Sequence, residues 1–510
     1  MMTDEARRSK LDAERAIVDP LPSSLHIPRV VLIVALAGLS LGGFITACLL
    51  TYRIGFPLDD AWIHQTYART LAQFGQMAYW PGQPSAGSTA PLWSGLLAVG
   101  LKLGFGLQVW AFLLGGMSLA AIALVGMAAF RSLCPSRPSW AILAGVLLVL
   151  EWHLVWAAGS GMETLPYALM VLLVLTGLLS EKVSWLAIGL EIGLSVWLRP
   201  DGITLAGPAL LALILVEPDR TGRWRGAVLL MLGLGVFFIP YLLFNRSLSG
   251  AWLPNTYFAK QAEYAILRLA PLWRRFLGEA ALPLVGVGLL LLPGFGMMIY
   301  QSFRRRVWGA LAGAIWVVGY LLLYAWRLPV TYQHGRYIIP VLPVFCIWGL
   351  AGFAGWYDPV SPPLWKRVIG KTWLFAAGLV LLAFWGLGAR TYAQDVAVIE
   401  SEMVDTARWV AEKTKPDALV AAHDIGALGY FGGRRLLDLA GLVSPEVIPF
   451  LRDEAHLSGF LDAQAVDYLV TFPGWYPELT ERAQLIHATG GRFSPAQGGE
   501  NMAVYLWRNP

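Results

Sequence analysis

Charged residues are scarce in this sequence. Only 14% of its 510 residues are Asp, Glu, Lys or Arg, whereas 57% are apolar, and a soluble domain has about 25% charged residues. Long uncharged apolar runs occur at Val30–Leu50, Ala227–Phe244 and Ala310–Tyr324. A helix needs about 20 such residues to cross a bilayer. The composition therefore argues against a soluble protein and predicts a multi-pass membrane protein.

Cysteine is nearly absent, and several ligand-binding patterns are missing. The three cysteines, Cys48, Cys134 and Cys346, lie in or beside apolar runs and indicate neither a disulfide framework nor a metal site. No glycine-rich loop matches a dinucleotide fingerprint or a phosphate-cradling loop. The net charge of +5 does not indicate nucleic acid, because a membrane protein carries its excess Lys and Arg in cytoplasmic loops.

The apolar runs divide the chain into three parts. Residues 1–28 are polar and are expected to form a cytoplasmic tail, because the run that follows is too long for a signal peptide. Residues 29–390 are expected to form an all-α polytopic module with about eleven spans. We place these spans at 29–51, 107–130, 139–158, 165–180, 184–198, 203–216, 227–245, 280–301, 307–326, 338–356 and 372–389.

The segment 91–105 decides the orientation of every later loop. It is apolar but only fifteen residues long and contains Lys102, so we interpret it as an interfacial helix of the first outer loop. The triplet Arg304–Arg306 then faces the cytoplasm, as the positive-inside rule requires. Five basic residues still fall in an outer loop, where the rule does not explain them: Arg246, Lys260, Arg268, Arg274 and Arg275.

Residues 391–510 contain no span and have a different pattern. Asp405–Lys413 predicts an amphipathic helix, and 418–422, 436–439 and 468–472 predict short strands. Alternating helices and strands favour a small α/β domain. With the cytoplasmic N-terminus and an odd number of spans, this domain is expected to be extracytoplasmic.

Polar residues in the outer loops and turns between the expected spans are candidate site residues. Asp59 and Asp60 follow the first span; a helix N-cap explains one acidic residue there but not readily two. Glu163 in Gly-Met-Glu-Thr and Arg199 in Arg-Pro-Asp-Gly lie at turns between spans, where a cap or a local ion pair is the alternative reading.

Three further motifs carry hydrogen-bond donors or residues that can border a bound ligand. Basic side chains at an interface can hold a phosphate or contact lipid headgroups, and a polar residue after a strand can mark a ligand edge or a tight turn. The candidates are Asn255, Tyr257 and Lys260 in Pro-Asn-Thr-Tyr-Phe-Ala-Lys; His334, Arg336 and Tyr337 in His-Gly-Arg-Tyr; and His423 and Asp424 in the tail.

In this order, the motifs resemble the GT-C superfamily of polyprenyl-phosphate-sugar-dependent glycosyltransferases. The resemblance covers about residues 29–450 and rests on Asp-Asp, PLWSGLLAVG, GMET, RPDG, PNTYFAK, HGRYIIPVLP and DIGALGYFGGRRLLDLAGLVSPE. It is greatest to the branch that includes the mycobacterial terminal arabinofuranosyltransferase. Protein O-mannosyltransferases and the lipid A aminoarabinose transferase are more distantly similar.

The resemblance implies an inverting transfer from a polyprenyl-phosphate sugar to a glycan, lipid or protein acceptor at the outer face of a bacterial plasma (inner) membrane. It implies that Asp59 or Asp60 is the base, and we expect Lys260, His334 and Arg336 to hold the phosphate. The sequence lacks the Asp-x-Asp pair of metal-using members, so no metal ligand is assigned, and a divalent metal stays an open alternative.

Two other functions remain alternatives at this point. A transporter or flippase of lipid-linked sugars would place charges near the bilayer midplane and show repeat symmetry. Here only Glu151 and Glu191 lie in or near spans, and no repeat is visible. A non-catalytic assembly or sensor protein would not need the Asp pair.

Overall fold

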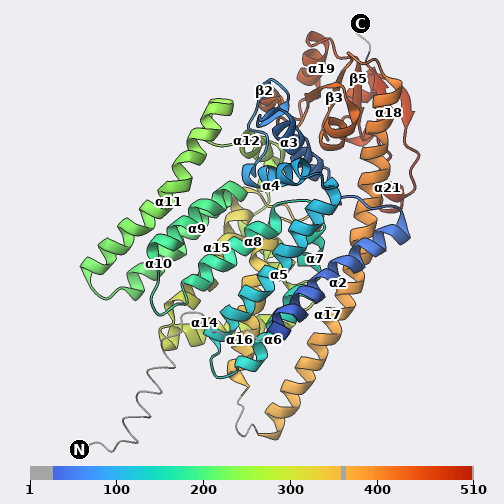
Figure 1. The fold of residues 1–510 in the computed structure, drawn as a ribbon. Helices are drawn as coiled ribbons and strands as arrows, with labels where there is room; N and C mark the ends of the chain where they lie inside the picture. The colour runs from blue at the N-terminus through green and yellow to red at the C-terminus, as the bar shows by residue number, and fades with distance from the viewer. Residues whose placement is uncertain (1–26, 358–362, 508–510) are drawn as a thin grey trace, which may run out of the picture.

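The computed structural model describes residues 27–357 and 363–507. The expected cytoplasmic tail lies outside the described residues, apart from its last two positions, which begin the first helix. A long helical module carries a small domain with a β-sheet at one end (Figure 1). Within the described residues, six helices are long and apolar enough to cross a membrane, or up to eight if two bent pairs each count as one span.

Each expected span coincides with helical structure, but the count of eleven stays a prediction. Three of the expected spans correspond to helices of only 10–17 residues, fewer than the roughly 20 that a comfortable crossing needs. The helices of the module that follow one another from the first span to the ninth are α2 (Ile27–Thr51), α5 (Leu107–Leu133), α6 (Ala141–Leu150), α7 (Trp152–Ala158), α8 (Thr164–Gly177), α9 (Trp185–Leu198), α10 (Ala206–Val216), α11 (Arg220–Ser249), α14 (Gly288–Arg305) and α15 (Trp308–Arg327). The last two are α16 (Leu342–Trp356) and α17 (Leu364–Val398).

A buried acidic residue causes the break in the third expected span. α6 ends at Leu150, and α7 begins at Trp152 after a bend of 57°. The Glu151 carboxylate accepts a hydrogen bond from the Leu154 N–H at 3.0 Å and one of its oxygens lies 2.7 Å from His153 Nδ1. Glu151 therefore caps α7, which explains a charge in an otherwise apolar segment.

The first loop folds into short elements between the module and the small domain. They are α3 (Asp60–Phe74), β1 (Ala78–Trp80), β2 (Gln83–Pro84) and α4 (Pro91–Lys102). With 12 residues, α4 is too short to cross a membrane, and it packs against α3. A second connection, between α11 and α14, contains α12 (Asn255–Glu263), η3 (Ala265–Leu269) and α13 (Leu272–Ala281).

The last span continues without a break into the small domain. α17, the π-helical turn η7 (Ile399–Val404) and α18 (Asp405–Lys413) form one helical run of 50 residues, which Figure 1 shows as the long orange helix. The amphipathic helix expected at 405–413 is therefore present, but as the end of this run. The expected domain start at residue 391 falls inside α17.

The small domain is built on a five-stranded sheet of order β4-β3-β5-β7-β6. β3 (Leu419–Ala422) pairs in parallel with β4 (Arg435–Asp438) and β5 (Tyr468–Thr471), which confirms the three expected strands. The sequence did not predict the antiparallel strands β6 (Gln484–Ala488) and β7 (Ala503–Leu506). α19 (Glu454–Ala463), α20 (Pro477–Arg482) and α21 (Phe493–Ala496) complete the domain.

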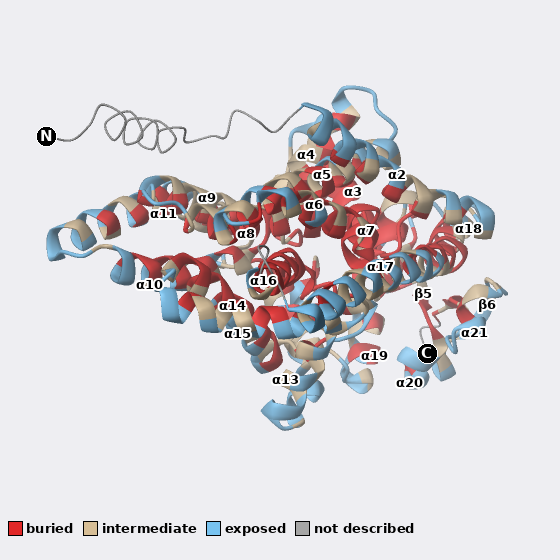
Figure 2. Ribbon diagram, turned by 90° about the horizontal axis from the view of Figure 1, so that it is seen from below, coloured by how far each residue is buried: buried red, intermediate tan, exposed pale blue. Residues whose placement is uncertain are grey.

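One face of the sheet packs directly against the helical module. Val420, Ala422 and Val470 on one face of the sheet belong to the same buried apolar cluster as the membrane helices. Ala421 and Leu469, whose side chains alternate to the other face, belong to a separate core with α19 and α20. Figure 2 shows buried residues running through the centre of the helices toward this domain.

Candidate active site

The two adjacent aspartates at the start of α3 have different environments. Both oxygens of Asp59 accept hydrogen bonds from the small domain, one from Gly426 N–H at 2.6 Å and one from Ala427 N–H at 2.8 Å. Burial raises the pKa of Asp59 to about 7, although these N–H groups oppose the rise. Asp60 instead lines a cavity in the helical module. Asp59 therefore docks the small domain, and only Asp60 can meet a molecule in the cavity.

Asp60 lies between two cations. Its Oδ2 is 2.7 Å from Arg336 Nη2 and 3.5 Å from Lys260 Nζ, and both cations also donate hydrogen bonds to the Tyr337 hydroxyl. Burial alone would raise the pKa of Asp60, but the charges of Arg336 and Lys260 outweigh it and lower the pKa. Asp60 is therefore ionised at neutral pH, with 28% of its side chain still accessible.

Arg336 retains unused hydrogen-bonding capacity. Its Nε and Nη1 atoms are buried and have no hydrogen-bond partner within the described part of the chain. A buried donor without a partner costs about 1–3 kcal/mol, so an acceptor that reaches either atom would be favoured. Phosphate oxygens are strong acceptors for such charged donors.

A second group of charges faces the same cavity, from Glu163 at the start of α8 and from the turn after α9. Arg199 Nη2 lies 2.8 Å from Asp201 Oδ2 and donates to the Tyr324 hydroxyl at 2.8 Å. Glu163 lies 3.3 Å from His64 and 3.9 Å from Arg199. Burial would raise the pKa of Glu163, but contact with His64 and the charge of Arg199 lower it to about 2.

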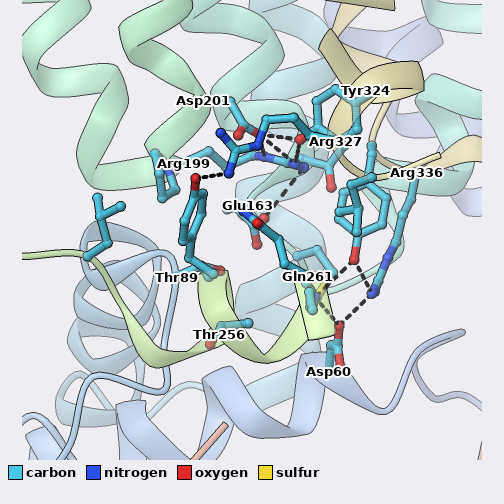
Figure 3. Close-up of a pocket in the computed structure, with 18 of the residues that line it drawn as sticks. Asp60, Thr89, Glu163, Arg199, Asp201, Thr256, Gln261, Tyr324, Arg327 and Arg336 are labelled. Carbon is cyan, nitrogen blue, oxygen red and sulfur yellow. Dashed lines mark hydrogen bonds and ion pairs between the residues drawn. The ribbon is translucent and has the colours of Figure 1, made fainter. Parts of the chain in front are cut away.

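These two groups form opposite walls of one cavity of about 430 Å³. Figure 3 shows Asp60 and Arg336 on one side and Glu163, Arg199 and Asp201 on the other. Of the sequence-predicted residues, those that line it are Asp60, Glu163, Arg199, Tyr257, Lys260, Arg336 and Tyr337. Most of the remaining wall is apolar, and the small domain contributes Leu442. The cavity can hold an anionic group with an attached apolar chain.

Two predicted site residues of the membrane module lie elsewhere. His334 adopts a left-handed backbone conformation (φ 56°), and its Nε2 lies 2.8 Å from Asp395 on α17. It therefore does not line the cavity and braces α17 instead of reaching a phosphate. Asn255 is buried, and its backbone N–H donates to Ala86 O, which anchors the start of α12 on the first loop.

The tail residues His423 and Asp424 follow β3 and do not line the cavity either. His423 Nδ1 lies 2.7 Å from the Tyr476 hydroxyl, and burial together with the charge of Arg452 lowers its pKa to about 3. Burial, with the nearby charges of Asp59 and Asp60, raises the pKa of Asp424 well above its ordinary value. His423 is therefore neutral at neutral pH, and Asp424 is harder to ionise than an ordinary aspartate.

Several residues that line the cavity are not among the candidate site residues predicted from the sequence. His64 lies four residues after Asp60 in α3, so helical spacing places both on one face. Asp201 belongs to the same turn as Arg199. Tyr324 and Arg327, at the end of α15, gave no signal beyond an aromatic and a basic residue at the end of a span.

The donor set around Asp60 does not fit a divalent cation. Its nearest charged neighbours are Arg336 and Lys260, whereas such metals require several oxygen ligands. Within the described ranges, no three His, Cys, Asp or Glu side chains lie together as a metal-binding group.

The loop after β3 is shaped to receive Asp59. A Cβ at Gly426 would lie 2.0 Å from the Asp59 carbonyl oxygen, whereas a Cβ at Gly432 would meet nothing closer than 3.7 Å. Arg69 also donates to the carbonyls of Gly429 and Tyr430 on this loop.

Gly426→Ala should therefore loosen the docking of the small domain and cost on the order of 2 kcal/mol, because Asp59 loses charge-assisted hydrogen bonds. Hydrogen–deuterium exchange of residues 424–431 in the full chain would show faster exchange. Gly432→Ala is the matched control and should leave exchange unchanged. Equal exchange in the two variants would contradict this role of Asp59.

Comparison with known proteins supports the fold assignment. Residues 389–505 match a family model described as a domain of unknown function (DUF8728), and no curated protein matches the sequence. ArnT from Cupriavidus metallidurans bound to undecaprenyl phosphate is similar with a TM-score of 0.60 and 16% identity, over 93% of this chain and 97% of that chain. The oligosaccharyltransferase of Archaeoglobus fulgidus is similar with a TM-score of 0.59 and 11% identity, over 88% of this chain and 70% of that chain.

The chain has the GT-C fold. This confirms the fold that the resemblance of the ordered motifs implies. The arabinofuranosyltransferase AftD from Mycobacteria is also similar, with 15% identity over 94% of this chain and 40% of that chain, but its TM-score of 0.48 is too low to decide the branch. In the GT-C fold of this chain, the cavity lies between the first-loop helix α3, helix α12 and the turn that contains Arg336.

Proposed function

We propose that this protein is an inverting membrane glycosyltransferase. It transfers a sugar from a polyprenyl-phosphate donor to a hydroxyl group of a glycan, lipid or protein acceptor on the extracytoplasmic side. The observation that carries the proposal is Asp60, an ionised carboxylate exposed to an apolar-walled cavity beside Arg336, whose buried Nε and Nη1 have no partner among the described residues. The GT-C fold of solved glycosyltransferases supports the same class of reaction.

The proposed step is a single displacement at the sugar C1. The acceptor oxygen forms a bond to C1 while the bond from C1 to the phosphate oxygen breaks, which inverts the configuration. Asp60 takes the proton of the acceptor hydroxyl. The leaving group is polyprenyl phosphate, and Arg336 and Lys260 stabilise the negative charge that develops on it.

Donor binding would itself increase the basicity of Asp60. In the free enzyme, Arg336 and Lys260 lower the pKa of Asp60, and a strongly acidic carboxyl group is a weak base. A phosphate held by the same two cations brings negative charge near Asp60 and offsets their effect. The carboxylate thus becomes an effective base when a donor is present.

The opposite wall would hold the sugar. Glu163, Arg199 and Asp201 are fixed to one another and to Tyr324 by close polar contacts. A rigid set of hydrogen-bonding groups around the sugar hydroxyls would orient the sugar for attack at C1. This orientation contributes more to the rate than binding affinity alone. The small domain, through Leu442 and the residues around His423, would border the acceptor side.

A donor panel tests the class of substrate. Purified protein in detergent is given the same sugar on undecaprenyl phosphate or on a nucleoside diphosphate, with glycan, lipid and peptide acceptors. We expect product only with the lipid donor, because the cavity wall is largely apolar. Product from the nucleotide sugar alone would contradict the proposal.

A further inference from the structure

A second cavity, of about 380 Å³, adjoins the first and is lined by arginines. We call it the arginine pocket and define it by Arg268, Arg275 and Arg327 with Gln261 and Trp326. Arg327 and Gln261 also line the first cavity, so the two spaces share a wall. Two of the basic residues that the positive-inside rule left unexplained, Arg268 and Arg275, are therefore collected at one place.

The positive charge of the arginine pocket is not balanced locally. Across the described ranges, none of its three arginines forms an ion pair with an acidic side chain. Arg275 donates to the carbonyls of Ala270, Ala325 and Trp326, which orients it on α15. Among the residues that the structure describes, Arg268 donates one hydrogen bond, to Gln261 O, whereas a guanidinium has five N–H groups. An oriented group of cations with free donors suits an anion.

The surroundings of the arginine pocket suit a lipid rather than a soluble anion. η3 and α13 expose Ile266, Leu269, Trp273 and Leu277, each more than half accessible. α13 is bent by 107° relative to α14, so it runs along the module while α14 is oriented to cross. Figure 2 shows α13 at the margin of the molecule with a largely exposed surface. An amphipathic helix of this kind lies in the membrane interface with its apolar face among the lipids.

We propose that the arginine pocket is a second lipid-phosphate site, which receives polyprenyl phosphate after transfer. This rests on the proposed function, because the leaving group of that reaction is a phosphate monoester on a long apolar chain. Such a group has greater negative charge than the phosphodiester of the donor, so a cluster of arginines favours the product over the donor. The shared wall at Arg327 and Gln261 gives a route from the first cavity.

Native mass spectrometry of the full chain, released from detergent, counts the bound lipid directly. With undecaprenyl phosphate as the probe, we expect two equivalents on the wild type. Arg268→Gln, alone or with Arg275→Gln, should weaken binding of one equivalent by about tenfold or more, because charge-assisted hydrogen bonds are lost. Arg274→Gln is the matched control, because Arg274 lies on the same helix but does not line the pocket.

Three other probe ligands, tested in the same way, identify the source of the phosphate. Undecaprenol should not occupy the arginine pocket, because it has no phosphate. Occupation by phosphatidylglycerol alone would show a headgroup site and overturn the role in product release. Binding of inorganic phosphate alone, or an undecaprenyl phosphate count that Arg268→Gln/Arg275→Gln does not change, would overturn the proposal. Failure of sugar transfer by a wild type that still binds two equivalents of undecaprenyl phosphate would instead overturn the proposed function.

Discussion

Replacing Asp60 by asparagine should lower the rate of sugar transfer at saturating donor by about 10²-fold or more. Asparagine has nearly the same shape but cannot take a proton from the acceptor hydroxyl, and loss of a general base typically costs about 10²–10⁴-fold. The variant should still fold, because Arg336 and Lys260 keep their hydrogen bonds to Tyr337. Initial rates under saturating donor and acceptor measure the effect.

The same variant should bind polyprenyl phosphate at least as tightly as the wild type. Asp60 competes with a phosphate for Arg336 and Lys260, so its neutralisation leaves both cations available. Asp59→Asn is the control at the adjacent position, and it should act mainly through docking of the small domain, with a smaller effect on rate. Full transfer activity in Asp60→Asn would contradict the assignment of Asp60 as the base.

Arg336→Gln should lower kcat/KM by about 10²-fold or more. The change removes the guanidinium whose buried Nε and Nη1 have no partner in the part of the chain that the structure describes. It thus removes a charged donor to the leaving phosphate, and loss of one such stabilising group costs about 10²–10³-fold. Initial rates at low donor concentration give kcat/KM. Arg304→Gln, an exposed arginine near the end of α14, is the control and should change nothing.

Arg336→Gln should also shift the pH dependence. Transfer requires ionised Asp60, and in the wild type Arg336 and Lys260 lower the pKa of Asp60. The acid limb of kcat/KM, which reports the free enzyme, should therefore lie below the ordinary carboxyl range in the wild type. Loss of one cation raises the pKa of Asp60, so the acid limb moves to higher pH. An unchanged limb, with kcat/KM reduced, would show that another group limits the rate at low pH.

The sequence predicted the positions of helices better than their lengths. Apolar runs locate the spans because the bilayer excludes unpaired backbone groups. They did not predict the break at Glu151, where a side-chain cap bends the helix by 57°. In the small domain, β3 and β5 were predicted from buried apolar runs. β6 was missed because its residues are mostly exposed and lack that signal.

The site could be predicted only as a set of candidate residues. Asp60, Lys260 and Arg336 come from separate elements, and no spacing rule within a helix or strand brings them together. The sequence also could not choose between Asp59 and Asp60. Successive residues at a helix start point about 100° apart, and here one faces the small domain and the other the cavity. Closeness to Arg336 in the sequence also could not predict that the His334 ring contacts Asp395 on α17.

The most direct test of the account is the transfer of labelled sugar from undecaprenyl phosphate by the purified wild type, with the configuration of the product at C1 determined by NMR. We predict a product with inverted configuration, formed by the wild type and lost in Asp60→Asn. Retained configuration would contradict the single displacement. If no acceptor yields product, and the reconstituted protein instead moves the lipid-linked sugar across liposome membranes, the protein is a transporter and the proposed function is wrong.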